Sequence, residues 1–212
     1  MQKLGLFGIF LSIGLHMNAQ TNTQDYTGEY YLQGVMETAS GFKLNPDSTF
    51  EFFFSYGALD RMGTGRWTVH GNDLVLNSKS RPPLDFKLVS TSAGDAKNIV
   101  IKISDPNKNL LRYIDCTVMG DKGSTTLTTD HDGYARFPVS KIDSIGLLFT
   151  WCPDRMSVFK VAKSGDHYYE FHFEPWIAEV FFDNFKLSID KEGLDGPHPL
   201  LVNKRFHYEK AK

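Results

Sequence analysis

Hydrophobic and polar residues alternate along most of this chain with a period of two, as expected for β-strands that bury one face. In TFEFFFSY (49–56), Phe50, Phe52 and Phe54 fall on one face and give the strand a strongly aromatic side. Short clusters of Gly, Asn, Asp, Ser and Pro separate such segments, and helical periodicity is almost absent beyond the N-terminal stretch. The pattern therefore predicts an all-β protein.

The first part of the chain, residues 26–95, predicts an antiparallel meander. The turn NPDST joins GFKL to TFEFFF, and GND (71–73) joins the strand around Trp67 to LVL. With GEYYLQGVME ahead and PLDFKLVS behind, the meander has six strands. Because a closed barrel needs about eight strands, we expect the later segments of 176–212 to complete it.

A polar stretch, STSAGDAKN (90–98), separates this meander from a second run of strands and turns that ends at HYYEFHFEP (167–175). The C-terminal strands need a sheet to join, and the meander has open edges to offer them. We therefore expect residues 97–175 to form a separate β domain, inserted between strands of the first one.

The most motif-like stretch is TTDHDGYARF (128–137). An EF-hand calcium loop needs a carboxylate at its first position and a bidentate Glu at its twelfth. Alignment on DHD puts Thr128 and Val139 there instead. The alternative is a turn in which Gly133 takes a positive φ and the aspartates bond to nearby backbone. The sequence favours the turn, between a β-branched strand and a returning strand YARF.

The strands IVIKISD, CTVMG, TTLTTDHDGYARFPV and IGLLFTW resemble those of carboxypeptidase regulatory-like domains. These are small β-sandwiches similar to transthyretin and collagen-adhesin B-type repeats, in which TDxDGxxxF marks one hairpin. The resemblance covers about 98–175 and implies an immunoglobulin-like sandwich with an accessory role and no catalytic residues. CPDRMSVFKV, after Trp151, is longer than that pattern.

The paired hairpins and the GxGxWxxxxxxLxL pattern around Trp67 resemble lipocalin-like β-barrel domains of exported bacterial proteins. Together the two resemblances imply an all-β fold class, in which a lipocalin-like antiparallel meander or barrel is combined with a small immunoglobulin-like β-sandwich.

The N-terminal sequence indicates export. Lys3 precedes an almost unbroken apolar run over 4–15, and the small residue Ala19 follows. That order is typical of a secretory signal peptide, here 1–19, and the run is too short for a membrane-spanning helix. No later stretch is long and apolar enough to span a bilayer, so we expect a periplasmic or extracellular protein without a membrane span.

Composition narrows the classes of partner. The formal net charge of −2 over 212 residues gives no basic face for nucleic acid. Hydrophobic residues at 41% are enough for a packed core.

Two alternatives stand for Cys116 and Cys152: a disulfide, which an oxidising compartment permits, or two free thiols packed in the core.

The strongest candidate for chemistry is EFHFE, where Glu170, His172 and Glu174 project from one strand face at intervals of about 7 Å. They could share a transition metal or pair as base and orienter. The alternative is the solvent face of an amphipathic strand, which the aromatic opposite face favours. CxxC, HExxH and GxSxG are absent, so a structural zinc site, a metalloprotease and an elbow-type serine hydrolase have no support.

Asp60 and Arg61, in the loop YGALDRMGTG, could orient a ligand at the barrel mouth or brace a long hairpin, and we favour bracing. The other candidate ligand contacts are the barrel aromatics Phe50, Phe52, Phe54 and Trp67. An open cavity lined by these rings would favour ligand binding, whereas a solid core would favour a structural role.

We therefore expect a non-catalytic exported binding or accessory module of the cell envelope, without a cofactor, that binds a small apolar ligand or an envelope protein. One alternative is a metal-dependent or hydrolytic enzyme that uses Glu170, His172 and Glu174. The other is a purely structural envelope protein.

Overall fold

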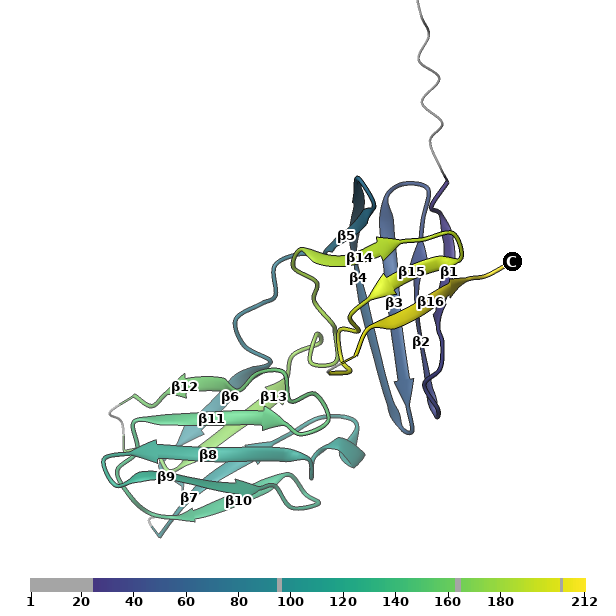
Figure 1. Cartoon of the computed structure of the whole chain (residues 1–212). Helices are drawn as coiled ribbons and strands as arrows, with labels where there is room; N and C mark the ends of the chain where they lie inside the picture. Colours follow the sequence, from purple (N-terminus) through teal and green to yellow (C-terminus); the bar gives the residue numbers. More distant parts are fainter. Residues whose placement is uncertain (1–24, 95–96, 163–164, 203) are drawn as a thin grey trace, which may run out of the picture.

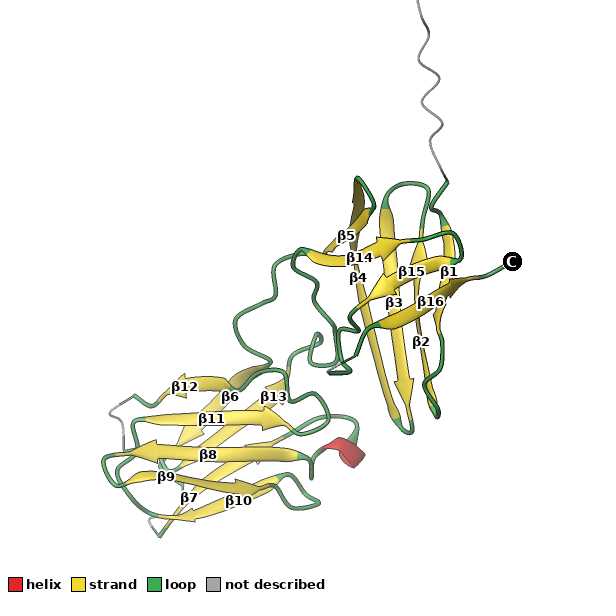
Figure 2. Cartoon of the chain, viewed as in Figure 1, coloured by secondary structure: helices red, strands yellow, loops and turns green. Residues whose placement is uncertain are grey.

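The computed structural model describes four stretches of the chain: 25–94, 97–162, 165–202 and 204–212. The expected signal peptide, 1–19, lies outside the described residues. These stretches are almost entirely strand and loop, with one short 3₁₀ helix, η1 (Lys108–Leu110) (Figure 2). The strands form a closed barrel and a two-sheet sandwich that lie next to one another (Figure 1). The predicted all-β fold class, a barrel combined with a sandwich, is confirmed.

The barrel is an antiparallel meander of eight strands that come from two separate segments of the chain. They are β1 (Gly28–Leu32), β2 (Thr38–Leu44), β3 (Thr49–Tyr56), β4 (Leu59–His70), β5 (Asp73–Asn77), β14 (Phe185–Ile189), β15 (Gly193–Gly196) and β16 (Phe206–Lys210). β5 pairs with β14, and β16 closes the barrel against β1. The sandwich strands therefore lie, in sequence, between two neighbouring barrel strands.

The sandwich packs two four-stranded sheets face to face. Its strands are β6 (Phe86–Ser92), β7 (Asn98–Ile103), β8 (Ile114–Gly120), β9 (Gly123–Thr128), β10 (Tyr134–Pro138), β11 (Ser144–Phe149), β12 (Ser157–Lys160) and β13 (Tyr168–Phe173). One sheet has the order β10-β7-β13-β6 and the other β12-β11-β8-β9. Inward residues of both sheets, among them Ile101, Phe171, Cys116 and Leu147, form one buried core.

The boundary between the two domains lies earlier than the sequence suggested. β6 was expected in the first domain, but it pairs with β13 and buries Phe86 in the sandwich core. The physical reason is that β5 already pairs with β4 and β14, so the barrel offers β6 no free edge. Placing 86–92 in the barrel domain was therefore wrong.

The stretch 128–137 contains the predicted turn but not the predicted hairpin. Asp130 Oδ1 accepts the backbone N–H groups of Asp132 (3.0 Å) and Tyr134 (2.8 Å), and Gly133 has a φ of 81°. The flanking strands, however, do not pair: β9 joins β8 in one sheet and β10 joins β7 in the other. The turn thus carries the chain from one sheet to the opposite one.

Aromatic side chains fill the inside of the barrel. Phe50, Phe52 and Phe54 of β3 are all buried, at most 6% exposed. Phe182, from the segment that leads into β14, enters between the strands, and its ring centroid lies 5.1 Å from that of Phe50 and 5.3 Å from that of Phe52. Gly63 on β4 makes room for it, because a Cβ there would lie 2.8 Å from the Phe182 ring. The barrel core is therefore packed with rings.

Candidate functional site

The side chains of Asp60 and Arg61 do not act together in the structure. As neighbours on β4 they point to opposite faces, so Asp60 is exposed while Arg61 is buried. Arg61 pairs with Asp154, in the loop between β11 and β12, at 3.0 Å (Nη1–Oδ1) and 2.5 Å (Nη2–Oδ2). It also donates to the carbonyls of Ala178 and Glu179. Arg61 thus braces the barrel against the sandwich.

A network of charges extends this contact across the junction. Arg81 lies 3.0 Å from Asp85 and 3.8 Å from Asp154, and Arg155 also binds Asp85. Burial opposes ionisation of Asp154, but the hydrogen bond and charge of Arg61 outweigh it and lower the pKa of the carboxyl. The network therefore links β4 of the barrel and the segment between β5 and β6 to the β11–β12 loop of the sandwich.

The aromatic candidates also have structural places. Phe50, Phe52 and Phe54 belong to the packed barrel core. Trp67 is half-buried against that core, and its indole Nε1 donates to the carbonyl of Asn45 at 3.2 Å. A solid core favours a structural role for these rings, as the sequence analysis argued. A ligand would therefore bind at other parts of the surface.

The EFHFE residues do not gather around a common point. Glu170 accepts hydrogen bonds from Ser104 Oγ (2.7 Å) and Ser90 Oγ (3.3 Å), while His172 is exposed. The pairing register between β13 and β6 shifts between Glu170 and Phe171. Among the residues that the structure describes, Glu170, His172 and Glu174 do not bring their potential ligand atoms within 4.8 Å of one another.

Both cysteines are buried free thiols. Cys116 faces the sandwich core from β8, and Cys152 lies in the loop after β11. Burial raises the pKa of each thiol, which keeps both protonated and unreactive at neutral pH. Of the two alternatives from the sequence, the structure has the free thiols.

One group of potential metal ligands does come together in the described residues: Asp190, Asp195 and His207. His207 Nδ1 lies 3.1 Å from Asp195 and 4.0 Å from Asp190. However, Asp195 of β15 and His207 of β16 are cross-strand neighbours in the antiparallel pairing of these strands. Asp190 Oδ1 accepts the backbone N–H groups of Glu192 and Gly193 in a turn. Cross-strand pairing and turn formation account for this group without a metal.

A buried serine–histidine pair inside the barrel was not anticipated from the sequence. Ser40 Oγ lies 3.0 Å from His198 Nε2 and donates to the carbonyl of Phe53. His198 Nδ1 accepts the backbone N–H groups of Leu200 (3.0 Å) and Leu201 (3.1 Å), so the ring proton is on Nε2. The histidine therefore donates to the serine and does not act as its base, which excludes a catalytic dyad in this state.

Instead, His198 positions the β15–β16 connection. Burial lowers its pKa to about 4, so the ring is neutral at neutral pH and its Nδ1 lone pair stays available to the two leucine amides. The ring also stacks with Tyr208 of β16 and packs against Phe54 of β3. This anchoring fixes the loop that borders an apolar opening at the barrel rim.

That opening is a crevice between the β1–β2 turn and the β15–β16 connection. Its volume is about 680 Å³, and it is lined by Gln33, Gly34, Val35, Met36, Leu201, Val202, Lys204, Arg205, Phe206 and His207. Met36 is 90% exposed and Val202 80% exposed, so both offer apolar surface to the solvent. We refer to this feature as the rim crevice.

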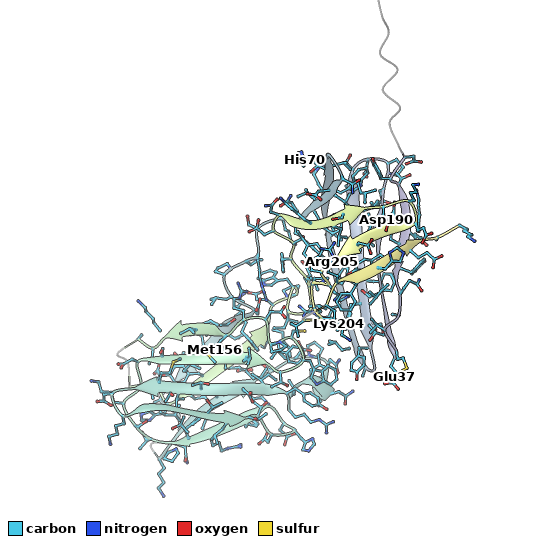
Figure 3. All side chains as sticks on the ribbon, viewed as in Figure 1. Glu37, His70, Met156, Asp190, Lys204 and Arg205 are labelled. Carbon is cyan, nitrogen blue, oxygen red and sulfur yellow. The ribbon has the colours of Figure 1, made fainter. Side chains whose placement is uncertain are left out.

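The rim crevice combines apolar and cationic groups. None of its described lining residues is acidic, and no described carboxylate lies within 4.0 Å of Lys204 or Arg205. His207 is the one lining residue engaged with an acid, Asp195. Figure 3 labels Lys204 and Arg205, which end the β15–β16 connection, and Glu37, which follows Met36. The sequence LLVNKRF places apolar residues beside basic ones, but this pattern alone does not indicate a crevice.

Comparison with models of known protein families, with curated proteins and with solved structures finds no match to this chain. Within the described stretches, no helix has the length and apolar character needed to cross a membrane.

Proposed function

We propose that this chain is an exported, non-catalytic binding module of the cell envelope whose rim crevice holds a small amphiphile with an anionic group. One observation carries the proposal: a crevice of about 680 Å³ in which exposed apolar side chains stand beside two cations that lack a carboxylate partner in the described residues. Sites for small molecules commonly occupy about 300–1,000 Å³.

The two sides of the crevice suit the two parts of such a ligand. Val35, Met36 and Val202 offer an apolar wall, and the unbranched Met side chain adapts to different shapes. Arg205 can bind a carboxylate or phosphate through two parallel N–H groups, with Lys204 as a second positive charge. The proposal therefore keeps the apolar ligand expected from the sequence but moves it from the barrel interior to the barrel rim.

Export is supported by the signal-like order of residues 1–19. An accessory role is supported by the resemblance of 98–175 to carboxypeptidase regulatory-like domains. The enzyme alternative has less support, because Glu170, His172 and Glu174 do not bring their ligand atoms within 4.8 Å of one another. In the Ser40–His198 pair, the histidine is the hydrogen-bond donor. A purely structural role is the second candidate, favoured by the packed barrel core.

Titration calorimetry with two probes of equal chain length, laurate and dodecyltrimethylammonium, tests the proposal below their micelle concentrations. Laurate should bind at one site per chain, and the cationic probe should bind at least tenfold more weakly. Val202→Asp should abolish laurate binding, while Val158→Asp, at an exposed valine of the sandwich, should leave it unchanged.

The basic residues are tested separately. Lys204→Glu with Arg205→Glu should reduce laurate affinity and remove the preference over the cationic probe. Equal affinities for both probes in the wild type, or equal effects of Val202→Asp and Val158→Asp, would refute the rim crevice as the binding site. An absence of saturable binding to any amphiphile would instead support the structural role.

A further inference from the structure

The outer face of the barrel carries a row of apolar residues that strand register brings into line. Tyr31 of β1 pairs with Gly41 of β2, Gly41 with Phe53 of β3, and Phe53 with Met62 of β4. Directly paired residues on neighbouring strands project from the same face. Tyr31 is 41% exposed and Met62 69% exposed. We call these four residues the outer-face row.

A hollow accompanies the outer-face row. Gly41 has no side chain between Tyr31 and Phe53, and the Phe53 ring leans over it, since a Cβ there would lie 3.0 Å from that ring. Tyr31 meets Phe53 edge-on, with ring centroids 6.1 Å apart. The hollow has a volume of about 390 Å³ and is lined by Tyr31, Phe53 and Met62 of the row but not by Gly41, because the Phe53 ring fills the space over the glycine. The row therefore offers both a depression and a protruding apolar side chain.

Charges of both signs surround this hollow. Lys43 of β2 pairs in register with Glu29 of β1 on one side and with Glu51 of β3 on the other. All three side chains line the hollow and are exposed. A partner of one charge sign would be repelled by part of this surface: an anionic partner, such as a nucleic acid, by Glu29 and Glu51, and a cationic partner by Lys43.

We infer that the outer-face row binds a second copy of this chain in a two-fold symmetric dimer. In such a contact the same patch faces itself, so it must contain its own complement. Met62 of each copy can enter the hollow that Tyr31 and Phe53 line in the other, and Lys43 of each copy can face Glu51 of the other. The small formal net charge, −2, opposes association only weakly.

The expected dimer is reversible. Four strands lie about 4.8 Å apart, so their outer face presents less than the roughly 800 Å² per partner of a standard interface. Such a small interface gives an association that depends on concentration in the micromolar range and not a permanent dimer. The closed barrel also leaves no open strand edge for pairing between copies, which directs contact to its faces.

Sedimentation velocity across micromolar concentrations tests the dimer. The sedimentation coefficient of the wild type should rise with concentration, and Met62→Lys should hold the chain monomeric throughout. Met156→Lys is the matched control, because Met156 is an exposed methionine on the sandwich (Figure 3). It should dimerise as the wild type does. A wild type that stays monomeric, or equal effects of the two methionine variants, would overturn the inference.

Charge reversal tests the pairing between copies. Lys43→Glu and Glu51→Lys should each weaken self-association about tenfold or more, because like charges then face each other across the two-fold axis. An equimolar mixture of the two variants should restore dimers, since each copy supplies the charge that the other lacks. Restored association with both variants folded, as judged by circular dichroism, supports the face-to-face contact. A mixture as weak as its components would overturn it.

Discussion

Arg61 of β4 and Asp154 of the β11–β12 loop, 93 residues apart in the chain, form a two-point ion pair between the barrel and the sandwich. The Arg61 side chain is 2% exposed and that of Asp154 29%. Beside them, Leu59 packs against the cores of both domains. The inserted domain is therefore held to its host by side chains as well as by its two connecting segments.

Asp154→Ala should destabilise the protein by about 2–4 kcal/mol, because it leaves a buried guanidinium without its charged partner. Urea unfolding measures the loss. Asp60→Ala, which removes an exposed carboxylate next to Arg61 in sequence, should change stability by less than about 0.5 kcal/mol. Replacing both partners, Arg61→Met with Asp154→Leu, should recover part of the loss. Similar losses for Asp154→Ala and Asp60→Ala would show that the ion pair has no such role.

His198 should make stability depend on pH in the mildly acidic range. Its folded pKa of about 4 lies below the ordinary value of 6.5, so the unfolded state takes up the proton first. Stability is full above pH 6.5 and falls as the pH decreases towards 4, by about 2 kcal/mol between pH 7.5 and 5. His198→Gln should flatten this fall, and His70→Gln, at an exposed histidine (Figure 3), should not. Equal slopes for both variants would contradict the assignment.

Phe182→Ala should cost about 3–5 kcal/mol, since it removes the ring that fills the barrel beside Gly63. Its neighbour Phe181 is only half-buried and stacks under Arg81. Phe181→Ala should therefore cost clearly less, and the comparison controls for the loss of one phenylalanine from this segment. Thermal and urea unfolding of both variants decide between them.

Deleting residues 200–212 should destabilise the barrel more than the sandwich. The deletion removes β16, which pairs with β1 on one side and β15 on the other, and it takes the buried Tyr208 out of the barrel core. Hydrogen exchange should show lost protection in 28–78 while 98–175 keeps its own. Protection that is lost only in the sandwich would contradict this prediction.

The candidate sites were harder to predict than the strands. The alternation in TFEFFFSY gave the inward phenylalanines correctly, and the glycine of DHDG gave the turn at Gly133. The residues around which we build the proposals lie on different strands and loops, such as Val35 with Val202 and Tyr31 with Met62. Their proximity follows from register and closure, which a linear pattern does not contain.

The sequence by itself determined the class of structure. A period of two with regular turn signals specifies strands that bury one face, and the surplus of strands after residue 176 pointed to a barrel completed from the C-terminus. These features depend on neighbours in the chain and can be derived from them.

Only the tertiary structure decided how the strands are shared and which surfaces stay open. It moved β6 into the sandwich, placed β9 and β10 in opposite sheets, and filled the barrel with Phe182 from a loop. The physical reason is that the pairing of strand edges and the filling of the core depend on the whole chain. A strand that could pair with either of two sheets joins the sheet whose edge is still open once the other sheet has closed.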